Sequence, residues 1–199
     1  HRAGATVALS GARVSSLQAL SAELGDRVHV LPCDLSDEDE VTALPKQANE
    51  AMGSVDILIN NAGVTRDNLL MRMSDDEWAS VLAINLTSTM RLCKGVLRGM
   101  MKARWGRIVN ISSIVGAIGN PGQANYAASN AGLVAMSKSL AYEVATRGIT
   151  VNCLAPGFIA TAMTEKLTDE QKKGILTQIP TGRMGKATEI GAAALYLSS

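Results

Sequence analysis

The sequence is poor in cysteine, carries little net charge and has no long apolar run, and each of these absences excludes a class of function. The three cysteines, Cys33, Cys93 and Cys153, are far apart and odd in number, so they form no metal-binding spacing and fit a reducing compartment. A net charge of +1 gives no support to a nucleic-acid-binding surface. No apolar run approaches the roughly 20 residues of a membrane span, and no secretory signal is visible. We therefore expect a cytoplasmic protein with neither a nucleic-acid nor a membrane partner.

Motifs of several common enzyme classes are absent as well. The two histidines, His1 and His29, have no cysteine or carboxylate neighbours arranged as metal ligands, so no metal site is expected. The sequence contains no zinc motif, no Gly-x-Ser-x-Gly elbow and no P-loop. It does contain 47% hydrophobic and 19% charged residues over a length of 199, which predicts a globular chain with a substantial core. We interpret residues 1–199 as one domain, because no linker or repeat divides them.

Short apolar runs alternate with stretches of helical spacing along the whole chain. The runs are apolar throughout rather than alternating with polar residues, which is typical of parallel strands covered on both faces. The fold class is therefore α/β, a Rossmann-type, doubly wound parallel sheet with three α/β/α layers. Strands are expected at Ala5–Leu9, Val28–Leu31, Val55–Ile59, Arg107–Ile111 and Ile149–Leu154. Helices are expected at Ser15–Leu24, from Ser36 to Met52, at Asp75–Lys102, at Asn125–Arg147, after Thr168 and from Thr188.

Two local features of the second helix follow from its sequence. Ser36 with Asp39 three residues later resembles a capping box. Pro45 lies within the helical pattern, where it removes a backbone donor and crowds the preceding turn, so a kink is expected between Val41 and Pro45.

The stretch from Ser112 to Asn130 carries the chemistry. It follows a buried strand, passes through a loop rich in glycine and asparagine, and enters a long helix near Asn125. A hydroxyl at the carboxyl end of a strand and a phenol at the start of a helix can converge in the crevice where open α/β sheets bind ligands. Ser113 and Tyr126 are such a pair.

This segment resembles the active site of the short-chain dehydrogenase/reductase family. In order along the chain, the landmarks of the resemblance are Asp34-Leu35, Asn60-Asn61-Ala62-Gly63, Asn85, Ser113, Tyr126 and Pro156 to Thr161. Within the family the sequence looks like a bacterial 3-oxoacyl-[acyl-carrier-protein] reductase. The resemblance implies NADPH-dependent reduction of 3-oxoacyl-[acyl-carrier-protein] to 3-hydroxyacyl-[acyl-carrier-protein] in fatty acid biosynthesis. It also implies the strand order 3-2-1-4-5-6-7.

Two pieces of the family pattern are absent: the first strand with its glycine-rich phosphate loop, and the closing strand. In the family the first strand lies between those that start here at Ala5 and Val55. We therefore expect these two strands not to pair with each other, and we interpret the chain as an excerpt that lacks one βα unit at its start and a strand at its end.

The resemblance assigns catalytic roles to four positions. Ser113 would hydrogen-bond the substrate carbonyl, and Tyr126 would donate a proton to the developing alkoxide. Asn85 would hold a proton-relay water through its backbone in a kinked helix. The family lysine position holds Asn130, whose uncharged amide can hydrogen-bond a ribose hydroxyl but supplies no positive charge. For Ser113, the alternative is a serine at the end of a strand that hydrogen-bonds nearby backbone groups. For Asn85, the alternative is an ordinary asparagine in the interior of a helix.

Cofactor contacts are implied at the strand ends. Asn61, Ala62 and Gly63 would let the backbone pass close to the adenosine ribose, and Asp34 would accept from the adenine amino group or simply mark the entry to a helix. Arg13, with no acid beside it, favours NADPH, or else is a solvated loop charge. The remaining implied contacts are Leu35, Tyr126, Asn130, Pro156, Gly157, Ile159 and Thr161, although Pro-Gly after a strand is also simply a turn.

The resemblance also implies partners. Arg104 and Arg147 match positions that contact the acidic acyl carrier protein, although isolated arginines are usually surface charge. A homotetramer is expected, with its main interface on the helices Asp75–Lys102 and Asn125–Arg147. Because Asn130 replaces the lysine, a second hypothesis is a catalytically inactive cofactor-binding or assembly subunit of the same fold.

Overall fold

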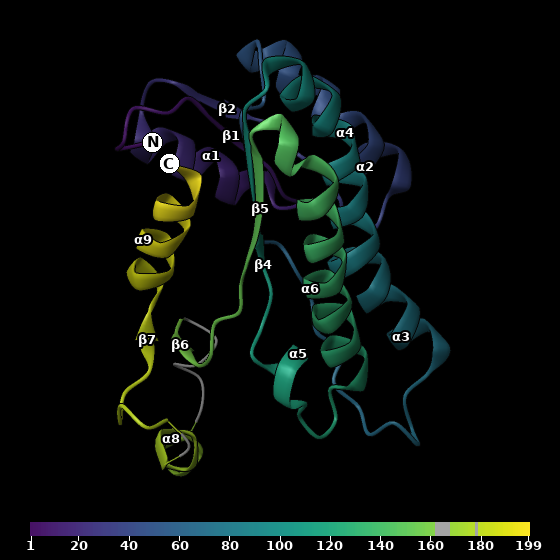
Figure 1. Ribbon diagram of the computed structural model, residues 1–199. Helices are drawn as coiled ribbons and strands as arrows, with labels where there is room; N and C mark the ends of the chain where they lie inside the picture. The colour runs from purple at the N-terminus through teal and green to yellow at the C-terminus, as the bar shows by residue number, and fades with distance from the viewer. Residues whose placement is uncertain (162–167, 178) are drawn as a thin grey trace.

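The computed structural model describes residues 1–161, 168–177 and 179–199, and it has the predicted α/β architecture (Figure 1). Its strands are β1 (Val7–Leu9), β2 (Val28–Val30), β3 (Ile57–Asn60), β4 (Gly106–Ile111), β5 (Ile149–Leu154), β6 (Ile159–Ala160) and β7 (Gly185–Lys186). Its helices are α1 (Val14–Leu24), α2 (Glu38–Met52), α3 (Asp75–Leu82), η1 (Ala83–Thr87), α4 (Ser88–Ala103), α5 (Val115–Ile118), α6 (Ala124–Val144), η2 (Ala145–Arg147), α8 (Asp169–Thr177) and α9 (Ala187–Ser198).

All strand pairs are parallel, as the apolar runs predicted. The strands β3, β4 and β5 form one sheet in that order, β1 pairs with β2, and β6 pairs with β7. Within the described residues β1 and β3 do not pair, which confirms the expectation for these two strands. Helices α4 and α6 pack on one face of the β3–β5 sheet, and α9 lies on the other face (Figure 1). This arrangement is the three-layer α/β/α sandwich.

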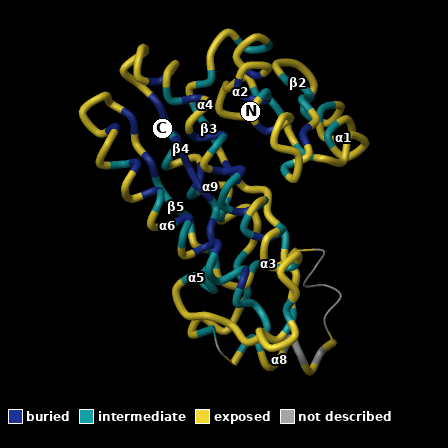
Figure 2. Tube along the Cα trace, turned by 90° about the vertical axis from the view of Figure 1, so that its right-hand side faces the viewer, coloured by how far each residue is buried: buried dark blue, intermediate teal, exposed yellow. Residues whose placement is uncertain are grey.

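The core lies between the β3–β5 sheet and the helices α4 and α6. Its buried members include Val96, Met100, Ile108, Val144 and Val151. Figure 2 shows the buried trace concentrated along β4 and β5, whereas α1 is largely exposed and β2 is half-buried. No residue of α1 is buried, although all of this helix lies in the described part of the chain. The well-packed half of the molecule is therefore the half that carries Ser113 and Tyr126.

Helix α2 differs from its prediction at its start. The expected capping box at Ser36 is wrong, because the N-cap is Asp37, whose carboxylate accepts from the backbone N–H groups of Asp39 and Glu40. Ser36 instead donates its N–H and its hydroxyl to Asp34 Oδ1, at 2.9 and 2.7 Å. An aspartate beside the helix competes better for the cap than a serine already bonded to another carboxylate.

Helix α2 continues through Pro45, which is buried against α4. A Cβ on Gly95 of α4 would lie 2.5 Å from Pro45 Cγ, so only glycine lets the two helices approach this closely. The proline ring thus fills the space that a side chain on α4 would otherwise occupy.

Two stretches of the chain are more divided than the sequence indicated. The single helix expected at Asp75–Lys102 consists of α3, a five-residue π-helical segment η1 and α4. The loop expected before Asn125 contains the short helix α5. Among the helices that the structure describes, none combines the length and the apolar character needed to cross a membrane.

Candidate active site

The carboxyl ends of β3, β4 and β5 place several predicted site residues at one edge of their sheet, and Arg13 follows β1 of the separate β1–β2 pair. Arg13 follows β1, Asn61–Gly63 follow β3, Ser113 follows β4 and Pro156–Gly157 follow β5. The segment 61–63 and the Arg13 side chain are exposed, so backbone and charge are accessible at this edge. A crevice outside the carboxyl ends of the strands is where open α/β sheets bind their ligands.

Two consecutive serines leave β4 with different surroundings. Ser112 is buried, its hydroxyl donates to the Asn130 carbonyl at 3.2 Å, and its N–H donates to the Leu154 carbonyl. Ser113 is half-buried, and its hydroxyl oxygen accepts from the Val115 N–H at 3.2 Å. A hydroxyl that accepts one bond keeps its own hydrogen, so Ser113 can still donate to a substrate oxygen. Ser112 joins strand to helix and Ser113 is the available hydroxyl.

Tyr126 lies in the first turn of α6 with its backbone held on both sides. Its N–H donates to Asn125 Oδ1 at 2.7 Å, and its carbonyl accepts from Ser129 Oγ at 2.9 Å and from Asn130 Nδ2 at 2.8 Å. The side chain is half-buried, and within the described part of the chain nothing hydrogen-bonds its hydroxyl. The phenol is thus free to meet a ligand while its backbone is fixed.

Asn130 occupies the turn of α6 that follows Tyr126, and its side chain is only 4% exposed. One amide hydrogen is used inside the helix, on the Tyr126 carbonyl, and its Cβ faces Gly116 of α5. A Cβ on Gly116 would lie 2.8 Å from Asn130 Cβ, so the glycine makes this contact possible. The second amide hydrogen and Oδ1 are not used by this bond, so they remain for the expected ribose contact.

Asn85 lies in the π-helical segment, where the sequence predicted a kinked helix. Insertions of this kind are frequent at functional sites. Its carbonyl accepts from Thr89 Oγ1 at 3.2 Å. Its side chain does something the sequence did not predict: Oδ1 accepts from the Val64 N–H at 2.8 Å, and Nδ2 donates to the Val64 carbonyl at 2.9 Å. Asn85 therefore holds the loop after β3 as a neighbouring strand would.

The same contact explains Gly63. A Cβ at this position would lie 3.3 Å from Asn85 Oδ1, tighter than an ordinary contact. The glycine lets the loop pass over the asparagine and keeps residues 61–63 exposed.

Charges at the proposed adenosine end are in place. The N–H and hydroxyl of Ser36 hold the pKa of Asp34 below its ordinary value, so this exposed carboxylate stays ionised at neutral pH. Leu35 is half-buried and packs on the core cluster around Val41 and Leu92. Arg13 is exposed at the N-cap position of α1.

The chain after β5 turns back onto the site. The Pro156 carbonyl accepts from the Ile114 N–H at 3.0 Å, which joins this turn to the segment after β4. Ile159 then pairs with Gly185, as β6 meets β7. Thr161 is exposed at the end of a described stretch.

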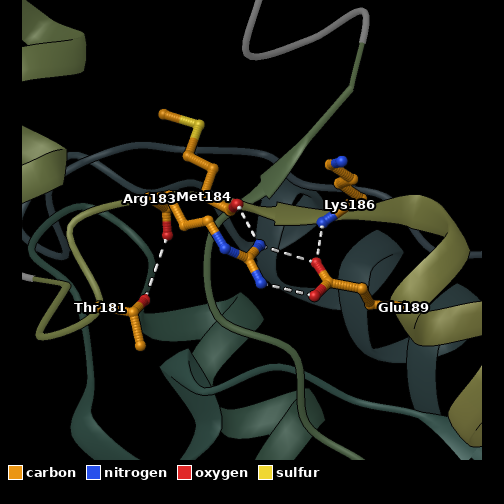
Figure 3. A network of polar contacts seen from close by, with 5 residues as sticks. All are labelled: Thr181, Arg183, Met184, Lys186 and Glu189. Carbon is orange, nitrogen blue, oxygen red and sulfur yellow. Dashed lines mark hydrogen bonds and ion pairs between the residues drawn. The ribbon is translucent and has the colours of Figure 1, made fainter.

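An ion pair joins the residue Arg183, just before β7, to Glu189 in the first turn of α9 (Figure 3). The Arg183 guanidinium donates to both oxygens of Glu189, at 2.7 and 2.9 Å, and Glu189 also accepts from the Lys186 N–H at the start of α9. These donors, Arg183 first, lower the pKa of Glu189 to about 2. This pair could not be predicted from the sequence, because its two residues are six positions apart and lie on either side of β7.

A row of polar side chains crosses the sheet behind the site, one residue before its carboxyl edge. Asn60, Asn110 and Cys153 are register partners on β3, β4 and β5. Asn60 donates to Asn110 at 2.8 Å, Asn110 donates to Ser137 Oγ of α6 at 2.8 Å, and Cys153 Sγ lies 3.1 Å from the same hydroxyl. Each buried amide is satisfied, so the row fixes the sheet edge and α6 in one arrangement.

Arg104 and Arg147 lie away from this edge. Both follow the carboxyl ends of their helices, α4 and α6, next to the amino ends of β4 and β5. Arg104 adopts a left-handed conformation and donates to the Thr146 carbonyl at 3.2 Å. The structure thus brings the two arginines to one corner, at the opposite end of α6 from Tyr126.

No metal site accompanies these residues: in the described ranges no three histidine, cysteine, aspartate or glutamate side chains gather to hold an ion.

Comparison with known proteins gives the relationship. The family model described as Enoyl-(Acyl carrier protein) reductase matches residues 1–199. Nodulation protein G of Rhizobium sp. (strain N33) is 55% identical over 199 residues, which are 100% of this chain and 81% of that protein. The 3-oxoacyl-[acyl-carrier-protein] reductase of Haemophilus influenzae is 54% identical over 98% of this chain and 81% of its own length. The enzyme of that name from Escherichia coli (strain K12) is 51% identical over 98% of this chain and 82% of its own length.

The family model matches the whole chain and the two reductases match 98% of it, in agreement with the parallel α/β architecture. The chain belongs to the short-chain dehydrogenase/reductase family.

Proposed function

We propose that this protein reduces 3-oxoacyl-[acyl-carrier-protein] to the 3-hydroxyacyl form in fatty acid biosynthesis, with NADPH as the reductant. Membership of the family makes the chain an oxidoreductase of the nicotinamide-dependent type. The observation that carries the finer proposal is that two half-buried residues keep available hydroxyls: Ser113, directly after β4, and Tyr126, in the first turn of α6.

The residues of the chain would divide the work as follows. Ser113 donates to the substrate carbonyl oxygen, and Tyr126 transfers its proton to that oxygen as negative charge develops on it. Asn85 holds the loop after β3 through its side chain and leaves its π-helical backbone for a proton-relay water. Asn130 holds the Tyr126 carbonyl, and it brings no charge to the phenolate.

Three features fit the adenosine half of a dinucleotide. They are the exposed segment Asn61, Ala62 and Gly63, the ionised Asp34 with the backbone of Leu35, and the exposed Arg13. Pro156, Gly157, Ile159 and Thr161 follow β5 and would frame the nicotinamide carboxamide, with Tyr126 and Asn130 beside its ribose. The bound cofactor supplies hydride. Arg13 is a cation with no acid beside it, which favours the 2′-phosphate of NADPH.

We propose the acyl carrier protein as the macromolecular partner, docking on Arg104 and Arg147, and a homotetramer as the assembly, in the cytoplasm. The two arginines lie at one corner, where an acidic protein could contact both. For the assembly, an open groove of about 270 Å³ runs between α4 and α6 and is lined by Met90, Leu97, Met136 and Leu140 among others. Light scattering on the full-length protein at micromolar concentration should give a tetramer, and a monomer would contradict the interface.

The alternative is an inactive cofactor-binding or assembly subunit of the same fold. Asn130 in place of the family lysine is the observation that favours it.

The deciding experiment measures NADPH consumption by the full-length protein with a 3-ketoacyl carrier thioester, alongside cofactor binding by titration. Slow turnover that rises in Asn130→Lys, with the gain lost when Tyr126→Phe is added, supports the reductase. Cofactor binding without any turnover, both as written and after Asn130→Lys, supports the subunit.

A further inference from the structure

Asn125, the residue before Tyr126, is among the most enclosed polar residues at the site. It is completely buried, with no exposed surface. Its amide nitrogen donates to the Arg66 carbonyl at 2.9 Å and to the Glu77 carbonyl at 3.2 Å, and its Oδ1 accepts from the Tyr126 N–H at 2.7 Å. One side chain therefore joins three segments: the loop after β3, the first turn of α3 and the first turn of α6.

The Tyr126 N–H is one of the four that a helix start leaves without an intrahelical partner. The N-cap residue Gln123 does not supply the missing acceptor, since its side chain makes no capping bond. Asn125 supplies it from inside the first turn. The position of the tyrosine backbone is thereby set by a side chain whose other end is fixed to two distant parts of the chain.

Gln123 makes a second, exposed connection between the same loops. Its amide nitrogen donates to both oxygens of Asp67, at 3.1 and 3.0 Å, and next to it the Asn68 N–H donates to the Gly122 carbonyl at 2.9 Å. Near its start, the loop after β3 is also held by the Asn85 side chain, which hydrogen-bonds the backbone of Val64. The loop that continues from the proposed adenosine contacts at 61–63 is thus tied at several points to the helix that carries the proposed acid.

We infer that Asn125, assisted by Gln123, is a positioning residue that couples the loop 64–68 to the phenol of Tyr126. The inference rests on the proposed function for the role of Tyr126 as the acid, but the coupling itself is a statement about geometry. In a reaction that needs reacting atoms aligned at contact distance, a misplacement of about 1 Å can cost about 10²-fold in rate.

The test can observe Tyr126 directly. The sequence has three tyrosines, and Tyr142 and Tyr196 are 88% and 78% exposed. The double variant Tyr142→Phe, Tyr196→Phe therefore leaves one tyrosine, whose ring gives a single NMR signal after isotope labelling. This readout is independent of turnover, so it separates failure of the coupling from failure of the proposed reductase activity.

In this background Asn125→Ala should shift and broaden the ring signal. Asn125→Asp should do the same, because a carboxylate keeps the acceptor for Tyr126 but cannot donate to Arg66 and Glu77. The matched control is Ser198→Ala, which removes a buried, hydrogen-bonded side chain whose partner is the Ala194 carbonyl within α9. The control should leave the ring signal in place.

Gln123→Ala keeps the test decisive if the buried variants do not fold, since its bond to Asp67 is exposed. It should give a smaller shift in the same direction. In an Asn130→Lys background, Asn125→Ala should also lower kcat by about 10²-fold while changing the KM for NADPH less. The inference would be overturned if the ring signal were unchanged in a folded Asn125→Ala or Asn125→Asp variant. If both of these variants are unfolded, an unchanged ring signal in Gln123→Ala would overturn it.

Discussion

Replacing Asn130 by lysine should raise turnover of 3-ketoacyl substrates by the full-length protein. As Tyr126 gives up its proton, negative charge develops on the phenolate oxygen, and Asn130 offers this oxygen no positive charge. The two residues lie one helical turn apart, so a lysine ammonium there can approach the phenol. At about 4 Å and an effective dielectric constant of about 20, the attraction is about 4 kcal/mol.

The structure sets what opposes this gain. The substitution removes the 2.8 Å bond from Asn130 Nδ2 to the Tyr126 carbonyl, a neutral hydrogen bond with a net contribution of about 1 kcal/mol. It keeps the Cβ that packs on Gly116, so the close contact with α5 is undisturbed. Since 1.36 kcal/mol is a factor of ten in rate, full use of the attraction corresponds to about 10³-fold, within the range of about 10²–10⁴ for positioned acid–base catalysis.

The assay compares kcat and the KM for NADPH in the protein as written and in Asn130→Lys, each with and without Tyr126→Phe. We expect kcat to rise in Asn130→Lys and cofactor affinity to change less. Tyr126→Phe should abolish the rise in kcat of Asn130→Lys, and it should matter little in the unmodified protein. If the unmodified protein already turns over at a rate that the lysine does not improve, another group supplies the charge and the reasoning is refuted.

Three further predictions concern charge. Arg13→Ala should abolish a preference for NADPH over NADH in titrations, and an unchanged preference would remove Arg13 from the cofactor site. Burial raises the pKa of both Cys33 and Cys93 from the ordinary value of 9.0 to about 11. The thiols of the unfolded chain therefore ionise first as pH rises, and the free energy of unfolding should fall between about pH 9 and 11. Urea titrations should show a shallower fall for Cys93→Ala. The pKa of Glu189, lowered from 4.5 to about 2 chiefly by Arg183, predicts stability that is present above pH 4.5 and lost as pH falls towards 2, and Glu189→Gln should lose this dependence.

The sequence predicted the elements of the fold well because the strands are short apolar runs between helical patterns. All five expected strands form, and the expected helices begin within a few residues of their predicted starts. The order of the strand-end motifs then placed Asn61, Ser113 and Pro156 at one edge, because β3, β4 and β5 are parallel strands of one sheet.

What sequence could not predict depends on side chains that bond across the chain. Asp37, rather than Ser36, caps α2, because the Ser36 hydroxyl donates to Asp34. The sequence alone does not show which of these neighbouring polar residues takes which role. The side-chain role of Asn85 and the buried position of Asn125 depend on contacts 21 and 59 residues away along the chain. An asparagine directly before the tyrosine was the available signal, but nothing local indicated its partners.

The length of α6 has a consequence for how a carrier-bound substrate reaches the chemistry. From Tyr126 to Arg147 there are 21 residues, and at about 1.5 Å each they span about 30 Å. A carrier protein held by Arg104 and Arg147 would stand that far from the phenol of the same chain, at the other end of the molecule. A tether shorter than this span would present its thioester to a neighbouring copy, so that docking and reduction of one substrate would be shared between two subunits. The helix would then act as a spacer, and an isolated subunit would bind the carrier without reducing what it carries.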